Sequence, residues 1–266
     1  TSLPLDLTEK IGPANVVVNC FEAFAEETPF RIALIRHLIG DKPRRVGHAP
    51  GISEDMMVNG PMNVDFADVR NRAVALMSSL RQASYARITA PGGTDLTVYI
   101  EGRGWDTDTQ VDPGHFGNLP CGEVWCAPVE HLGEGLLVCD GSIGDLGAVP
   151  APVHITVDNG RVTKVECTDG DFKARVEELL ALDDEAKVMG EFGIGINPGA
   201  RITGNLLEDE KAFRTAHIAF GNNEEMPGGR NRSRTHRDFL FRDPTIVIHN
   251  VDGHAFRIVE DGLVSV

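Results

Sequence analysis

Residues 191–238 read EFGIGINPGARITGNLLEDEKAFRTAHIAFGNNEEMPGGRNRSRTHRD, and this stretch decides how we interpret the fold and the function. Glu191 lies among glycines and apolar residues, where a carboxylate needs a partner because an unpaired buried charge is unfavourable. His217 opens the apolar run HIAFG, and Asp238 follows His236 by two residues. Since residues i and i+2 of a strand point to the same side, His236 and Asp238 can bind one ion together.

A fifth candidate ligand precedes this stretch. Glu123 lies just before an apolar strand in the segment NLPCGEVWCAPVE. Taken singly, each candidate also fits an ordinary structural role, such as an exposed glutamate or a hydrogen-bonded core histidine. His217, His236 and Asp238 together match a facial triad for Fe(II) and equally part of a zinc, cobalt or manganese hydrolase site. With Glu123 and Glu191 there are five ligands, which suit two ions about 3.5–4 Å apart better than one.

The composition sets bounds on the class of protein. The 266 residues are 41% hydrophobic and 24% charged, so the chain can bury a sizeable core. A formal net charge of -15 argues against a nucleic-acid partner but not against a bound cation. No run approaches the ~20 apolar residues of a membrane span, and no basic segment with an apolar core opens the chain. Five cysteines, an odd number, fit free thiols. We therefore expect a cytoplasmic protein without membrane partners.

The apolar pattern of the first third predicts a small α/β domain, residues 1–84. Continuous apolar runs predict buried strands, and helical spacing predicts helices capped by Thr28 and Asp65. The predicted elements are strands at 14–20 and 44–50 and helices at 28–40 and 65–84. An alternation of strand and helix predicts a parallel sheet.

The remainder, residues 85–266, predicts a β-rich metal-binding domain, so the fold class is α+β (mixed α/β). Short alternating stretches flank three turn signals, which predict hairpins. These signals are Gly92-Gly93, Asn159-Gly160 and Asp252-Gly253. An amphipathic stretch at 171–186 predicts a helix.

Several segments resemble the aminopeptidase T (leucyl aminopeptidase) family of metallopeptidases. They include PGISEDMMVNG, ITAPGGTDLTVYIEGR, NLPCGEVWCAPVE, GEFGIGINPGARITGNLLEDEKAFRTAHIAFGNN and THRDFLFRDPTI, and the resemblance runs from about residue 45 to residue 246. It implies the fold of that family and a dinuclear site of two glutamates, two histidines and an aspartate. These positions fall on Glu123, Glu191, His217, His236 and Asp238. Where family peptidases carry a tyrosine, seven residues after the first ligand histidine, this chain has Glu224.

Three functions remain open. The resemblance implies a metal-dependent hydrolase of aminopeptidase type with zinc, cobalt or manganese, as one ion or two. A related branch, the 2,5-dihydroxypyridine dioxygenases, holds a single Fe(II) with the equivalents of His217, His236 and Asp238 and cleaves a hydroxylated N-heteroaromatic ring. That branch lacks a carboxylate at the position of Glu123, which favours the hydrolase. The third is a non-catalytic binding protein on the same fold.

Further residues are candidates for catalysis and substrate binding. Glu224 would move a proton in the hydrolase, and His115 would act as the base in the dioxygenase. Arg230 and Arg232 lie in GGRNRSR, the only basic cluster, and with Arg103 they are candidates for binding a substrate carboxylate. Each of the five also fits a solvated loop residue. We expect a peptide or small-molecule substrate and a homo-oligomer.

Overall fold

The structure is a computed structural model that describes residues 3–22 and 24–265. The elements up to residue 118 are α1 (Leu5–Ile11), β1 (Val16–Phe21), the 3-10 helix η1 (Ala25–Glu27), α2 (Thr28–Asp41), β2 (Arg45–Pro50), α3 (Glu54–Val58), α4 (Phe66–Ser79), β3 (Ala83–Thr89), β4 (Asp95–Tyr99), β5 (Trp105–Thr107) and β6 (His115–Asn118).

The elements that follow are β7 (Glu123–Cys126), β8 (Glu134–Cys139), β9 (Ser142–Ile143), β10 (Gly147–Ala148), β11 (Val153–Asp158), β12 (Arg161–Glu166), α5 (Gly170–Leu180), the 3-10 helix η2 (Asp184–Lys187), β13 (Met189–Gly195), α6 (Leu206–Asp209), β14 (Thr215–Gly221), β15 (His236–Arg242), β16 (Thr245–Asn250), β17 (Ala255–Glu260) and β18 (Leu263–Val264). The fold is α+β, as predicted.

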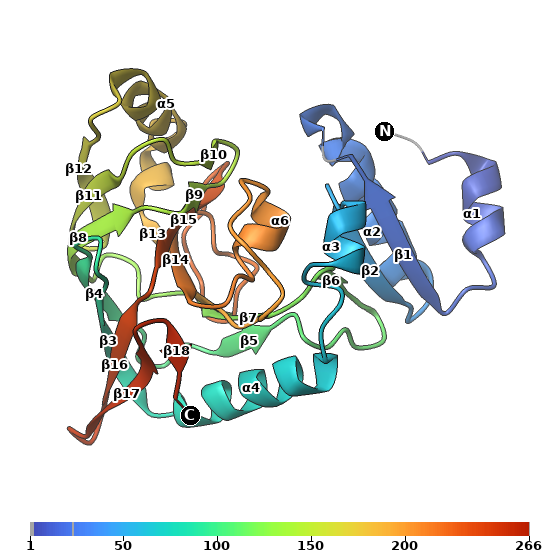
Figure 1. Ribbon diagram of the computed structural model, residues 1–266. Coiled ribbons are helices and arrows are strands. Elements are labelled where there is room, and N and C mark those ends of the chain that lie inside the picture. The colour runs from blue at the N-terminus through green and yellow to red at the C-terminus, as the bar shows by residue number, and fades with distance from the viewer. Residues whose placement is uncertain (1–2, 23, 266) are drawn as a thin grey trace.

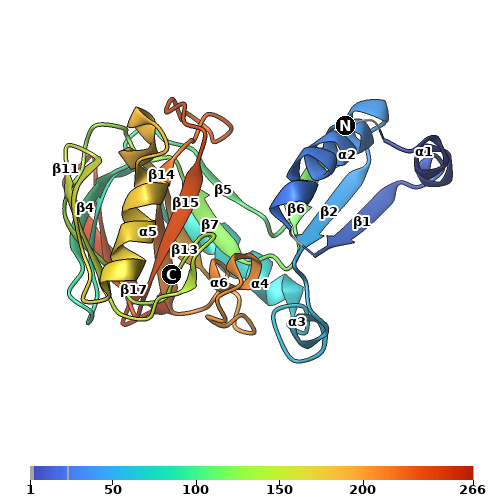
Figure 2. The ribbon, with the colours of Figure 1, turned by 90° about the horizontal axis from the view of Figure 1, so that it is seen from above.

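A small N-terminal unit stands beside a larger β-rich unit (Figures 1 and 2). The N-terminal unit comprises α1, β1, η1, α2, β2 and the later strand β6. Its three strands pair in parallel in the order β1-β2-β6, which confirms the predicted parallel sheet. The core of this unit is small, with Leu34 and Leu38 of α2 packing on Val46 of β2.

The predicted cap of α2 was wrong. Thr28 is the first residue of the helix, and Glu27 holds the N-cap position without a side-chain cap bond. The cause is the 3-10 helix η1, which runs directly into α2, so the backbone at Glu27 is already helical with φ -78° and ψ -18°. The hydroxyl of Thr28 is free for another partner and accepts a hydrogen bond from Arg31 Nη2 at 2.8 Å.

The β-rich unit comprises all elements from α4 onward except β6, and it contains two large sheets. One has seven strands in the order β10-β9-β15-β14-β13-β7-β5, and the other has eight in the order β12-β11-β8-β4-β3-β16-β17-β18. Buried apolar residues of both sheets and of helices α4 and α5 form one continuous core. The three predicted hairpins are confirmed as β3-β4, β11-β12 and β16-β17.

Helix α4 belongs to the β-rich core, although the apolar pattern predicts it as part of the first domain. Asp65 caps it as predicted, accepting a bond from the amide of Ala67 at 2.9 Å. Its buried residues Val69, Ala73 and Leu76 pack within the large cluster, not with α2. The division at residues 84 and 85 stays a prediction, and in the structure the two hydrophobic clusters separate before α4.

No helix in the described ranges is long and apolar enough to cross a membrane. The expected cytoplasmic location and homo-oligomer stay predictions.

Candidate metal centre

Four neighbouring strands of the seven-stranded sheet carry the five predicted ligands. Glu191 lies on β13, His217 on β14, His236 and Asp238 on β15, and Glu123 is the first residue of β7. These strands lie side by side in the order β15-β14-β13-β7 and pair in antiparallel fashion. Every residue of β13 and β14 is buried. Their continuous apolar sequence therefore places the two charged positions inside the protein, where a partner is required.

Gly193 makes room for His217. The two residues face each other in the β13–β14 register. A Cβ atom at Gly193 would lie 2.0 Å from Nε2 of His217, which is far inside van der Waals contact. The glycines of EFGIG therefore do more than break the strand pattern, because one of them leaves space for an imidazole ring.

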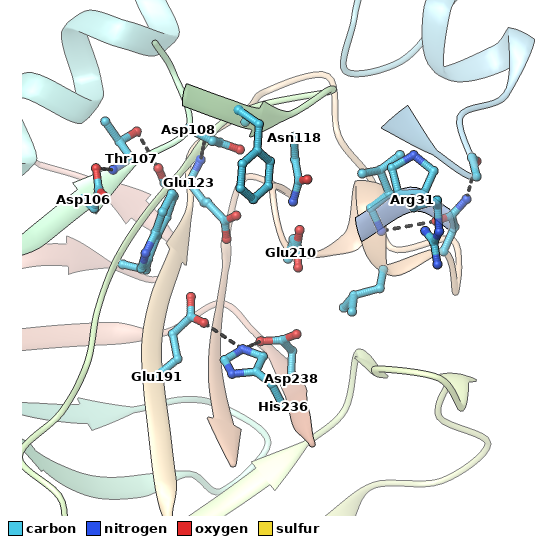
Figure 3. A pocket seen from close by; sticks show the side chains of 18 of the residues that line it. Arg31, Asp106, Thr107, Asp108, Asn118, Glu123, Glu191, Glu210, His236 and Asp238 are labelled. Atoms are coloured by element: carbon cyan, nitrogen blue, oxygen red, sulfur yellow. Dashed lines mark hydrogen bonds and ion pairs between the residues drawn. The ribbon is translucent and has the colours of Figure 1, made fainter. Parts of the chain in front are cut away.

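The ligand atoms form two groups that share Glu191. One group contains Glu123, Glu191 and His217, and the other contains Glu191, His236 and Asp238, each with its candidate ligand atoms within 4.8 Å of one another. His217 Nε2 lies 3.4 Å from a carboxylate oxygen of Glu123 and 3.4 Å from one of Glu191. The other oxygen of Glu191 lies 2.9 Å from His236 Nε2, as Figure 3 shows. Ligand atoms bound to one ion at about 2.0–2.2 Å are roughly 3–3.6 Å apart, so these spacings fit a divalent metal.

The orientation of His236 supports the same conclusion. Its Nδ1 donates a hydrogen bond to the carbonyl of Asn222 at 2.7 Å. A backbone carbonyl that fixes one ring nitrogen turns the other toward a metal in many metal sites. Here Nε2 faces two carboxylates, Glu191 at 2.9 Å and Asp238 at 3.6 Å. Burial would lower the pKa of His236, but these two carboxylates raise it well above its usual value, so that without a metal Nε2 carries a proton. A bound cation would take the place of that proton between the imidazole and the carboxylates.

The charges at Glu191 and His217 are set by opposing effects. Burial would raise the pKa of Glu191, but hydrogen bonds from His217 and His236 lower it to about 2. Burial would lower the pKa of His217, but the Glu191 carboxylate, with Asp238 and Glu123, raises it to about 9. At neutral pH and without a metal, Glu191 is thus ionised and His217 is protonated. A histidine ligand is neutral, so a bound cation would displace the His217 proton.

Comparison with known proteins shows the family of the chain. The sequence profile of the thermophilic metalloproteases (M29) matches residues 63–264, most of the chain. The chain belongs to the M29 family. A search of proteins with curated functions found no match.

Two solved structures share the fold of this M29 protein. The 2,5-dihydroxypyridine dioxygenase of Pseudomonas putida is 19% identical with a TM-score of 0.74, and the match covers 98% of this chain and 74% of that one. Wild-type AmpT from Thermus thermophilus is 16% identical with a TM-score of 0.65, and the match covers 96% of this chain and 94% of that one. At these identities the similarity shows the fold alone. The family is one of metalloproteases, which supports a metal-dependent hydrolase.

Lys211 lies beside the candidate ligands, and the sequence did not indicate its position. It is fully buried, and its Nζ lies 2.7 Å from Glu123 Oε1 and 3.7 Å from Asp108, with Glu210 as a third partner. Burial would lower the pKa of Lys211, but these three carboxylates raise it well above its usual value. One carboxylate oxygen of Glu123 is therefore already paired with the positive charge of Lys211.

The sequence around Lys211 hid this role. LLEDEK looks like an exposed, charged helix, yet Glu208 and Asp209 are buried as well. Glu208 accepts from the amide of Arg201 at 3.1 Å, and Asp209 accepts from the amide of Thr203 at 2.7 Å. Because these two carboxylates hold the 201–204 loop, the segment folds inward and carries Lys211 to Glu123. A short run of acids between two buried strands was the only signal.

A cavity of about 1200 Å³ lies between the N-terminal unit and the metal centre. Glu123, Glu191, His236 and Asp238 line it from the β-rich unit, and Figure 3 shows their carboxylates and imidazole at its wall. His115, on β6, also lines it, so the predicted base does face the cavity.

The other predicted catalytic and substrate-binding residues do not line this cavity. Glu224 is bound by Arg232 at 2.8 Å in an exposed pair. Arg103 forms a nearly buried ion pair with Glu130, and the backbone amide of Arg230 donates to the same Glu130 at 2.7 Å. These contacts hold the loop before β15 in place. Their predicted roles in the reaction therefore have no support from geometry.

Proposed function

We propose that this M29 protein is a metal-dependent hydrolase of aminopeptidase type that cleaves an amide or peptide bond with metal-activated water. The observation that carries the proposal is the shared carboxylate. Glu191 belongs to both donor groups, with Glu123 and His217 on one side and His236 and Asp238 on the other. A carboxylate common to two donor sets is the arrangement that two-metal hydrolases use.

Different residues of the protein would have different roles in this reaction. When bound, two divalent ions lower the pKa of a water molecule and polarise the scissile carbonyl. Glu191 would hold both ions, and the Asn222 carbonyl would keep His236 Nε2 directed at one of them. Glu210 replaces Glu224 as our candidate for moving the proton. It lines the cavity beside the ligands (Figure 3), and burial raises its pKa although Lys211 opposes the shift.

A specific observation keeps the single-metal dioxygenase as a second candidate. Lys211 already neutralises part of Glu123 at 2.7 Å. If that ion pair persists, the Glu123 group would hold no second ion, and one Fe(II) would be held by His217, His236 and Asp238. Against this, His217 groups with Glu123 and Glu191, whereas His236 groups with Asp238 and Glu191.

Metal analysis with two activity assays tests the proposal. Purified protein is analysed by mass spectrometry for zinc, cobalt, manganese and iron, and is then assayed with dipeptides and with 2,5-dihydroxypyridine under oxygen. Two equivalents of metal with peptide hydrolysis support the hydrolase. One equivalent of iron with oxygen uptake and no hydrolysis would replace it with the dioxygenase, and no stoichiometric metal would favour the non-catalytic binding protein.

Glu123→Gln separates the two enzyme functions further. Glutamine keeps the shape and can still bond to Lys211, but it is a weak metal ligand. For the hydrolase we expect metal content to fall from two equivalents to one and hydrolysis to fall at least about a hundredfold. Glu134→Gln, at an exposed position on β8, is the matched control. Unchanged metal content in Glu123→Gln would rule out a dinuclear site that uses this residue.

A further inference from the structure

The cavity is strongly acidic. Of the described residues that line it, nine are aspartate or glutamate, whereas Arg31 is the only arginine or lysine. A substrate carboxylate is therefore repelled over most of the cavity wall. Arg31 offers such a group the one positive charge outside the metal centre.

Arg31 has bonding capacity left over. Its Nη2 donates to the neutral hydroxyl of Thr28 at 2.8 Å. Its Nε is buried and has no hydrogen-bond partner among the described residues, and no described carboxylate forms an ion pair with the side chain. Arginine readily forms bidentate pairs with carboxylates. It is therefore unusual that Arg31 has no acidic partner in a cavity lined by nine acids. The Thr28 contact fixes one arm of the guanidinium and leaves the rest available.

The position of Arg31 suits one end of a substrate. In Figure 3 it lies across the pocket from His236 and Asp238, on the wall that α2 supplies. The charge of Arg31 also affects the pKa of a neighbouring histidine. Burial, and then the positive charge of Arg31, lower the pKa of His48 to about 4, so this neighbour is neutral and does not compete for an anion. A cavity of about 1200 Å³ has room for a short peptide between the two walls.

We propose that Arg31 binds a carboxylate of the substrate at the end remote from the metal centre, and that the preferred substrates are short peptides carrying such a group. This inference rests on the proposed hydrolase function and adds the substrate class. The carboxylate has two sources, the free C-terminus of a dipeptide or an acidic side chain next to the scissile bond. Both would pair with the same guanidinium.

Steady-state kinetics of the metal-loaded protein with three substrates test the proposal. Leu-Gly carries a free C-terminus, Leu-Gly-amide carries none, and Leu-Asp-amide carries only the side-chain carboxylate. We expect the wild-type protein to prefer Leu-Gly over its amide, and Arg31→Gln to raise KM for Leu-Gly about tenfold or more with kcat changed less than about twofold. KM for Leu-Gly-amide should stay unchanged. If the side chain is the source, Leu-Asp-amide shows the preference and the Arg31 dependence instead.

Two control variants sharpen the result. Arg36→Gln removes an exposed arginine from the same helix outside the cavity and should leave all three KM values unchanged. Arg31→Lys keeps the positive charge but loses the two parallel N–H donors of the guanidinium. Its KM for Leu-Gly should lie between those of the wild type and Arg31→Gln. The proposal would be overturned if neither Leu-Gly nor Leu-Asp-amide had a lower KM than Leu-Gly-amide in the wild type, or if Arg31→Gln raised all three KM values equally.

A binding assay keeps this inference separate from the hydrolase function. The ligand is a reduced isostere of Leu-Gly, with CH2–NH in place of the amide, titrated into the metal-loaded protein by calorimetry. Arg31-dependent binding of the acid over its amide supports the site even if no peptide is cleaved, in which case only the hydrolase function fails. Cleavage without any such dependence leaves the hydrolase standing and rejects the role of Arg31.

Discussion

The two units of this protein hold their cavity-facing charges in different ways. In the β-rich unit, the ligands come from paired strands whose register sets their separations, and β13 and β14 are buried throughout. In the N-terminal unit, Arg31 projects from a helix over a small core of Leu34, Leu38 and Val46. The edge strand β1 leaves Val16 60% exposed. Metal chemistry needs donor distances fixed within tenths of an ångström, whereas a salt bridge to a substrate tolerates more variation.

This difference explains where the functions lie. Glu191 and the two histidines are fixed by the large core behind the seven-stranded sheet, so the metal centre shares the stability of that core. Among the described residues, the N-terminal unit reaches the cavity through α2, the last residue of β2, β6 and the loops beside them. Damage to the first unit should therefore change substrate affinity before it changes metal content, and damage to the second should do the reverse.

Substitution His236→Ala should have the largest effect. It removes a ligand whose Nε2 lies 2.9 Å from Glu191, so one donor group keeps only its carboxylates. We expect activity to fall on the order of 1000-fold or more and at least one metal ion to be lost. His254→Ala, at an exposed turn position, is the control and should behave as wild type. Full activity with full metal content in His236→Ala would remove this residue from the site.

The sequence indicated those ligands whose positions follow from the geometry of a single strand. His236 and Asp238 share a side because they are two residues apart in a strand, and both line the cavity. Glu191 stood out because its neighbours in EFGIG are apolar. The pairing of β14 between β13 and β15, which brings His217 to the others, depends on long-range contacts that no spacing reveals.

Other parts could not be read from the sequence because tertiary contacts override local appearance. Lys211 looked like part of a solvated charge run, but buried carboxylates draw it inward. Strand β6 lies between β5 and β7 in the chain, yet it pairs with β2 of the N-terminal unit. Arg31 looked like an ordinary helix residue, because nothing in the spacing of α2 tells which element faces it.

Gly193→Ala should have an intermediate effect that stays within the β-rich unit. The new methyl group would lie 2.0 Å from His217 Nε2, so the imidazole must leave its position. We expect metal affinity to fall about tenfold or more, and overpacking to lower the free energy of unfolding by ~1–3 kcal/mol. KM for substrates should change little in the protein that retains metal.

Gly170→Ala is the matched control for this prediction. A Cβ there meets nothing within 4 Å, so the free energy of unfolding should stay within about 1 kcal/mol of wild type. Calorimetric metal titration and thermal unfolding compare the two variants. Wild-type metal affinity in Gly193→Ala would show that His217 has room to move and does not depend on the glycine.

Leu38→Ala should affect metal binding least, because it damages only the N-terminal unit. Leu38 lies on the buried face of α2, and removing its side chain costs ~2–5 kcal/mol of local stability. We expect α2 and Arg31 to lose their fixed position, so KM for carboxylate-bearing peptides rises while metal content stays at the wild-type level.

Ile32→Ala on the same helix, at a side chain that is 44% exposed, should change neither quantity. Metal analysis and limited proteolysis of the same samples provide the measurement. If Leu38→Ala loses metal in step with its loss of peptide affinity, the two units unfold as one cooperative block, and the division of labour between them would have to be abandoned.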